Sequence, residues 1–216
     1  MKTLLVTALF AFTATHAHSA EISTIADHAI IMDAATGLVL FEKDSETPTA
    51  PASMSKLMTI AIVFDRIKSG QLSLDDEFPV SEKAWRMEGS KMWTRVDTKI
   101  RVGDLLQGVI VQSGNDACVV LAEGVSGTEE AFAELMTKKA REWGLTDSIF
   151  ANSTGWPDPE HKMSTKDLAL LARKIITDYP DLYAMFKERE FIWEKIRQPN
   201  RNPLLSNFEG ADGLKT

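Results

Sequence analysis

A serine and a lysine stand one helical turn apart near the start of an apolar segment of the chain. The segment reads PASMSKLMTIAIVFDRI from Pro51 to Ile67, and Ser53 and Lys56 are three residues apart within it. Residues at this spacing share one face of a helix, about 5–6 Å apart at Cβ. A serine hydroxyl is a poor nucleophile without a base in reach, and burial among apolar neighbours favours the neutral amine that a lysine base needs. The pair therefore suits nucleophilic attack on an acyl group.

On its own, the pair has an ordinary structural explanation, as a serine near a helix start and a lysine that extends to solvent. Two other short motifs accompany it. The sequence SGN spans Ser113–Asn115 between two apolar helical stretches, where an inter-helix turn is the simpler interpretation, and Lys215-Thr216 follows Ala211-Asp212-Gly213-Leu214. In this order, S-x-x-K, S-x-N and K-T match the three signature motifs of the serine enzymes that react with penicillin.

From about Ala29 to Thr216, the chain resembles the low-molecular-weight penicillin-binding proteins, which are the D-alanyl-D-alanine carboxypeptidases of bacterial cell walls. The resemblance extends beyond the three motifs, to IIMDAATGLVL, PASMSKLMT, LLQGVIVQSGNDACVVLAE, FKEREFIWEKIRQPNRNPLL and DGLKT. It implies that Ser53 is the acylated nucleophile, that Lys56 is its base, and that Ser113 passes a proton to the departing D-alanine. It also implies an oxyanion hole of backbone N–H groups, one of them from Ser53.

The resemblance also implies a set of substrate-binding residues. Asn115 would bind the substrate amide, and Lys215 and Thr216, on a strand at the edge of the sheet, would help to hold its carboxylate. Arg201 matches an arginine near the family's active site, although a structural ion pair explains it equally well. The substrates implied are peptidoglycan pentapeptide stems, with penicillin acylating the same serine, and no cofactor or metal is implied.

Four other features receive weaker interpretations. Cys118 is expected to be a small buried residue one turn after Asn115. His161, in TGWPDPEHK, and His28 are expected at the surface rather than in catalysis. The segment Ser90–Trp93 is expected to border the cleft, because the family has a mobile loop there.

Hydrophobic periodicity predicts an α+β protein in which a helical part is inserted between strands. Strands are expected at 29–33 and 38–42, joined by a turn with Gly37, and a further β-like segment at 191–196. Helices are expected from Ser53 to Ile67, at 105–111 and at 117–123, from a Thr128 cap to Trp143, and from Ser164, where Asp167 suggests a capping box. The resemblance implies the β-lactamase/DD-peptidase-like fold, with an antiparallel sheet and flanking helices.

In that family the third motif continues with Gly, more strands, a helix, a small β-rich domain and an amphipathic helix that anchors the protein to the membrane. This sequence ends at Thr216. We therefore expect residues 21–216 to be a catalytic domain that is incomplete at its C-terminus, and that is poorly stable or inactive by itself. Membrane attachment would use the segment beyond it.

The composition restricts the partners and the compartment. The 216 residues carry a formal net charge of −7, which argues against nucleic acid as a partner. Residues 1–20 have Lys2, an apolar run and small residues before Ala20, which is typical of a signal peptide; the run is too short to span a bilayer. We expect a periplasmic protein. Cys118 is the only cysteine, so no intramolecular disulfide forms, and the usual zinc sites would need more His and Cys.

Three other functions remain open. A class A β-lactamase shares the scaffold, but such enzymes carry SDN and an E-x-x-L-N loop, and here Glu160 is followed by His-Lys-Met. A non-catalytic penicillin-sensing or wall-binding domain would keep Ser53 and Lys56 without turnover. An endopeptidase that cuts wall crosslinks differs only in the reach of its substrate.

Overall fold

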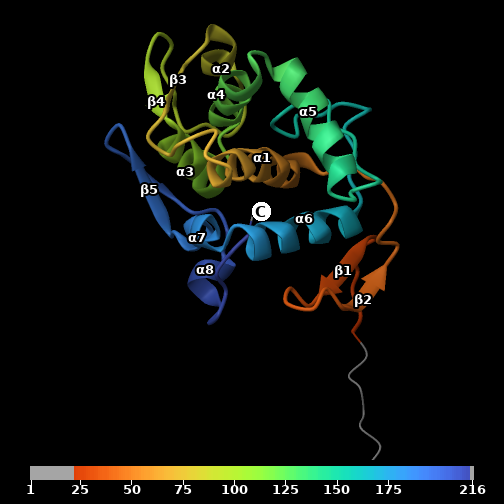
Figure 1. Cartoon of the computed structure of the whole chain (residues 1–216). Helices are drawn as coiled ribbons and strands as arrows, with labels where there is room; N and C mark the ends of the chain where they lie inside the picture. Colours follow the sequence, from red (N-terminus) through yellow and green to blue (C-terminus); the bar gives the residue numbers. More distant parts are fainter. Residues whose placement is uncertain (1–21, 215–216) are drawn as a thin grey trace, which may run out of the picture.

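The structure is a computed structural model that describes residues 22–214, so the predicted signal peptide and the motif Lys215-Thr216 lie outside the described residues. Helix α1 runs through the middle of the molecule, with α6 on one side and α3 and α4 on the other (Figure 1). The helices are α1 (Lys56–Lys68), α2 (Glu82–Arg86), α3 (Val102–Gln112), α4 (Asn115–Ser126), α5 (Glu129–Glu142), α6 (Thr165–Asp178), α7 (Pro180–Tyr183) and α8 (Leu204–Asn207), with short 3₁₀ turns η1 (Ala52–Ser55) and η2 (Ala184–Lys187).

The core is built around α1, whose residues from Lys56 to Phe64 are all buried. Apolar side chains recur on every face of this stretch, which is the pattern of a helix surrounded by other elements. Its neighbours contribute fully buried residues of their own, among them Leu105 of α3, Leu121 of α4 and Phe132 of α5. A helix fixed on all sides gives the residues at its N-terminus a rigid support.

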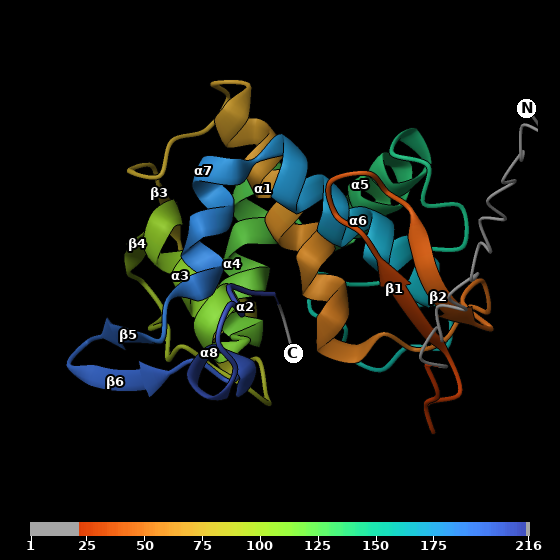
Figure 2. The same ribbon diagram turned by 90° about the horizontal axis from the view of Figure 1, so that it is seen from below.

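The strands of the described part form three separate antiparallel pairs: β1 (Ala29–Met32) with β2 (Val39–Lys43), β3 (Glu77–Pro79) with β4 (Lys99–Arg101), and β5 (Glu190–Trp193) with β6 (Ile196–Pro199). The first hairpin and the β segment near 191–196 are confirmed, and so is the α+β class. The β1–β2 hairpin lies along α6, and the β5–β6 hairpin projects from the opposite end of the molecule (Figure 2).

The predicted helix caps are present, with one difference. Thr128 Oγ1 accepts a hydrogen bond from the Ala131 amide at 3.1 Å, and Ser164 Oγ accepts one from the Asp167 amide at 3.1 Å. The Asp167 carboxylate does not complete a capping box. It accepts hydrogen bonds from Asp147 N and Ser148 Oγ instead, so it fastens the preceding loop to α6. Within residues 22–214, no helix has the length and apolar character needed to cross a lipid bilayer.

Candidate active site

The predicted nucleophile and base lie side by side. Ser53 is in the η1 turn, and Lys56 is the first residue of α1. Lys56 Nζ lies 2.9 Å from Ser53 Oγ, which is hydrogen-bond distance. Ser53 is partly exposed, whereas Lys56 is only 1% exposed. The serine can therefore be reached by a substrate while its partner amine stays shielded from water.

Lys56 has a second partner that directs its amine toward the serine. Its Nζ donates a hydrogen bond to the carbonyl oxygen of Thr154 at 2.6 Å. Burial lowers the pKa of Lys56, the positive charge of Arg201 lowers it further, and Cys118 acts in the opposite direction. A neutral amine donates through its N–H groups and accepts through its lone pair. It can thus remain bonded to Thr154 while it takes the Ser53 proton.

The loop that carries Thr154 is organised by Asn152, which the sequence interpretation missed. Asn152 Oδ1 accepts hydrogen bonds from the amides of Thr154 (3.1 Å), Gly155 (2.8 Å) and Trp156 (3.0 Å). Its Nδ2 donates to the Trp156 carbonyl at 3.0 Å. Asn is a common turn former because its side chain bonds nearby backbone, so the motif Asn-Ser-Thr-Gly was a usable signal. One side chain therefore fixes the carbonyl that binds Lys56.

Gly155 lets this loop lie directly against η1. Its φ is +78°, and a Cβ at this position would be 1.9 Å from the carbonyl oxygen of Ala52. Ala52 itself has φ +48°, an uncommon left-handed conformation for a residue other than glycine. Backbone strain of this kind clusters at functional sites, and here it lies beside Ser53.

Ser113 and Asn115 lie at the junction of α3 and α4, and α4 packs against α1. Ser113 ends α3 with φ +63°, and its buried Oγ has no hydrogen-bond partner among residues 22–214. A buried hydroxyl in this condition is costly unless it has another role. Asn115 donates from Nδ2 to the Glu88 carbonyl at 2.8 Å, and its amide donates to the Ser90 carbonyl at 2.7 Å.

Asp116 holds the loop beside Asn115, and the sequence interpretation missed it too. Its carboxylate accepts hydrogen bonds from the amides of Met92, Trp93 and Thr94, each at 2.9 Å. It is fully buried in the first turn of α4, where a negative charge is favourable. Ser90 is hydrogen-bonded to Asn115, which agrees with the expectation that Ser90–Trp93 borders the cleft and leaves it a prediction.

Arg201 also reaches this loop. Its guanidinium donates to Ser90 Oγ, and no acidic side chain between residues 22 and 214 forms an ion pair with it. The structural ion pair weighed as an alternative is thus absent from that part of the chain. Asn202 Nδ2 donates to the carbonyl of Leu214 at 3.4 Å, so the residue before the third motif lies next to the Arg201 segment. Lys215 and Thr216 are outside the described residues.

The expectation of a surface position was wrong for His161. This residue is 2% exposed and packs against Phe150, with ring centroids 5.4 Å apart in an edge-to-face arrangement. Burial lowers the pKa of His161 to about 4, and the nearby Lys56 charge acts in the same direction. Its charged sequence neighbours suggested a surface loop, and those neighbours are exposed or partly exposed, but the His161 side chain itself turns inward. His28 is partly exposed, with Nδ1 3.0 Å from the Asp44 carbonyl, and Cys118 is buried as predicted.

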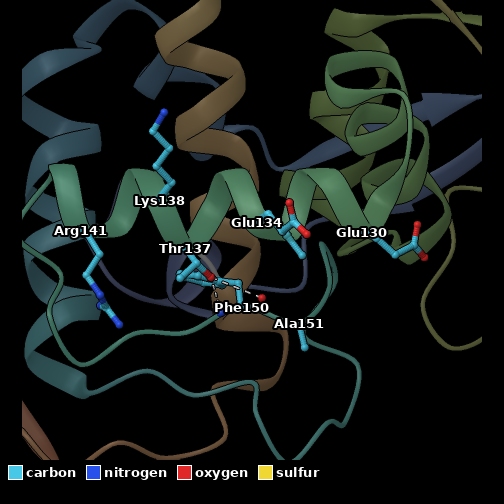
Figure 3. A pocket seen from close by; sticks show the side chains of 8 residues that line it. Glu130, Glu134, Thr137, Lys138, Arg141, Phe150 and Ala151 are labelled. Atoms are coloured by element: carbon cyan, nitrogen blue, oxygen red, sulfur yellow. Dashed lines mark hydrogen bonds between the residues drawn. The ribbon is translucent and has the colours of Figure 1, made fainter.

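A separate groove of about 560 Å³ runs along the outer face of α5, and Figure 3 shows the side chains that line it. Two of the residues that line it are hydrogen-bonded, from Phe150 N to Thr137 Oγ1, at 3.0 Å. The lining residues are Glu130, Ala133, Glu134, Thr137, Lys138, Arg141, Phe150 and Ala151, and they include no nucleophile with a base beside it. Within residues 22–214, no group of three or more His, Cys, Asp and Glu side chains is placed to hold a metal ion.

Comparison with known sequences agrees with the resemblance. Residues 13–216 match the Peptidase_S11 family, described as D-alanyl-D-alanine carboxypeptidase. The chain is 41% identical over 194 residues to D-alanyl-D-alanine carboxypeptidase DacC of Escherichia coli (strain K12). The aligned region covers 87% of this chain and 48% of the relative. The chain thus spans about half the length of the curated relatives it matches.

Solved structures show the same fold. The D-alanyl-D-alanine carboxypeptidase DacD from Francisella tularensis superposes with a TM-score of 0.92 at 32% identity, over 95% of this chain and 62% of that one. Penicillin-binding protein D2 from Listeria monocytogenes, in its ampicillin-bound form, superposes with a TM-score of 0.78 at 26% identity, over 88% of this chain and 78% of that one. The α+β fold expected from the sequence is therefore the penicillin-binding protein fold.

Proposed function

We propose, since the chain belongs to the Peptidase_S11 family of D-alanyl-D-alanine carboxypeptidases, that it contributes the catalytic serine and lysine of such an enzyme. The complete protein would remove the terminal D-alanine from peptidoglycan stem peptides. The observation that carries the proposal is the sequence of contacts from Ser53 Oγ to Lys56 Nζ and from Nζ to the Thr154 carbonyl. It supplies a nucleophile, a shielded base and a fixed orientation for that base.

Acylation follows from these contacts. Lys56 Nζ takes the hydroxyl proton as Ser53 Oγ bonds to the carbonyl carbon of the penultimate D-alanine. As the peptide C–N bond breaks, the leaving amine receives a proton, which passes from Lys56 through the hydroxyl of Ser113, and D-alanine departs. The buried, unpartnered Oγ of Ser113 suits this exchange, because it has both a proton to give and lone pairs to accept one. Water then hydrolyses the Ser53 ester and restores the free hydroxyl.

Substrate binding would use residues near the N-terminus of α1 and near the junction of α3 and α4. Asn115 Nδ2, which here donates to the Glu88 carbonyl, would bind the substrate amide. Arg201, Lys215 and Thr216 would hold the terminal carboxylate, and the cationic guanidinium suits an anionic group. β-Lactams would acylate Ser53 in the same way, and the ampicillin-bound form of the Listeria protein supports this part of the proposal.

We also propose that the protein acts in the periplasm, in cell-wall synthesis and the control of cell shape. The composition of residues 1–20 supports export through a signal peptide. Membrane association would come from a segment outside the residues described here. This location would bring Ser53 to its peptidoglycan substrate.

The test is D-alanine release from Nα,Nε-diacetyl-L-Lys-D-Ala-D-Ala by the complete protein. We expect release by the wild type and none by Ser53→Ala. Ser69→Ala is the control, since Ser69 is an exposed serine just after α1. Release that persists in Ser53→Ala would contradict the proposal. Acylation by penicillin without any D-alanine release would favour the sensor alternative, and rapid release of hydrolysed penicillin would favour a β-lactamase.

A further inference from the structure

Trp156 lies between the two sides of the candidate site. On one side, it lines a pocket of about 80 Å³ together with Pro51 and Ala52, which directly precede Ser53. On the other side, it reaches Gly89. A Cβ on Gly89 would be 3.3 Å from Trp156 Cζ3 and 2.8 Å from Asn115 Nδ2, so the indole and the Asn115 amide lie against the same backbone position. One aromatic side chain thus borders both the nucleophile's turn and the predicted amide-binding residue.

The backbone of Trp156 is held in place by hydrogen bonds within its loop. The Trp156 amide donates to Asn152 Oδ1 at 3.0 Å and to Thr154 Oγ1 at 3.1 Å, and its carbonyl accepts from Asn152 Nδ2 at 3.0 Å. Asn152 Oδ1 also accepts from the Thr154 amide, so the same side chain orders the segment whose Thr154 carbonyl binds Lys56. The backbone from which the ring projects is therefore ordered relative to Lys56 before a ligand binds, which lowers the entropic cost of binding against the ring.

The ring is also available to a ligand, because Trp156 is 42% exposed. Exposure alone does not indicate a role, since scattered apolar residues are common at protein surfaces. Trp85, in α2, is equally exposed at 42%. What distinguishes Trp156 is a rigid backbone and a position beside Asn115. Tryptophan in such a setting offers a large, flat apolar surface at little conformational cost.

We propose that Trp156 is a specificity-determining residue that forms an aromatic wall of the subsite on the acyl side of the scissile bond. The group that packs on it is the side chain preceding D-Ala-D-Ala in a peptide, or an aryl side chain attached to the β-lactam ring of a penicillin. This inference rests on the proposed function, in which Asn115 binds the substrate amide next to the indole.

The experiment measures the second-order rate of Ser53 acylation in the complete protein by two compounds. Benzylpenicillin carries an aryl side chain on the acyl side, and 6-aminopenicillanic acid has none. We expect Trp156→Leu to lower the ratio of the two rates about tenfold, as the loss of one aromatic contact implies. Trp156→Phe should retain most of the ratio, and Trp85→Leu should leave it unchanged.

Two results would contradict the proposed role of Trp156. The first is a ratio in Trp156→Leu equal to that of the wild type, while both compounds still acylate Ser53. The second is an equal loss with both compounds, which would make Trp156 a structural support for the loop. Failure of the wild type to be acylated by either compound is a different outcome, because it contradicts the proposed function itself.

Discussion

Lys56 and Thr154 are joined by a hydrogen bond across 98 residues of sequence, from Nζ to the backbone carbonyl at 2.6 Å. A backbone carbonyl accepts a hydrogen bond but carries no charge and does not titrate. It therefore orients the amine without adding the negative charge that would hold Lys56 in its ammonium form, as a carboxylate partner would. This arrangement keeps the lysine buried, aimed at Ser53 and available as a base.

Replacing Lys56 should abolish most of the acylation while the fold remains. Lys56→Ala removes the base, and Lys56→Arg replaces it with a group that stays charged. We expect acylation by a fluorescent penicillin to be about 10²–10⁴-fold slower in both variants, which is the usual contribution of a general base. Lys68→Ala, at the exposed end of the same helix, should behave as the wild type. Normal acylation in Lys56→Arg would contradict the assignment.

The rate of acylation should rise with pH as Lys56 loses its proton. Because burial lowers the pKa of Lys56 from 10.5, the midpoint of this rise should fall below pH 10.5. The positive charge of Arg201 contributes to the lowering, so Arg201→Ala should move the midpoint to higher pH. A pH–rate profile of penicillin acylation measures both midpoints. An unshifted or lower midpoint in Arg201→Ala would contradict this electrostatic explanation.

Asn152 should influence catalysis through the position of the Thr154 carbonyl. In Asn152→Ala three backbone amides lose their acceptor, and we expect acylation about 10–100-fold slower. Asn152→Asp keeps an oxygen at the same place and should restore part of the rate. The check is the acylation rate of each variant beside its circular dichroism spectrum. Equal rates in the wild type and in Asn152→Ala, with unchanged spectra, would show that the loop does not position the base.

Gly155→Ala should damage the site because its Cβ would collide with the Ala52 carbonyl. The matched control is Gly144→Ala, since Gly144 has φ +79° and no atoms within 4 Å of an added Cβ. The control should lose about 1 kcal/mol of its free energy of unfolding, from the strain of an alanine at positive φ alone. We expect Gly155→Ala to lose at least about 2 kcal/mol more, because of the added collision. Urea denaturation of both variants gives the comparison. Equal losses in the free energy of unfolding would contradict this prediction, because they would mean that the loop shifts to accept the added Cβ at little cost.

Local patterns allowed the first part of the site to be predicted from the sequence. Ser53 and Lys56 are close because of helix geometry alone, and the β1–β2 hairpin and the Thr128 cap also depend on neighbours in sequence. Asn152 bonds amides two to four residues along the chain, so its turn left a local signal, but the contact of that turn with Lys56 spans 98 residues. Asp116 left no such signal, because it accepts from amides more than twenty positions away.

The burial of His161 shows the same limit. Its sequence neighbours, from Asp158 to Lys162, are polar and suggest a surface loop, and most of them are exposed or partly exposed. The histidine alone turns inward, onto Phe150. A single buried position within a polar loop leaves no periodic pattern for sequence reasoning to detect.

The most direct test of the account is intact-mass analysis of the complete protein after reaction with benzylpenicillin, followed by peptide mapping. The arrangement of Ser53, Lys56 and Thr154 predicts one covalent adduct, on the peptide that contains Ser53, and its loss in Ser53→Ala. A well-folded protein that gains no adduct, or that gains one on a different residue, would contradict the assignment of Ser53 as the nucleophile.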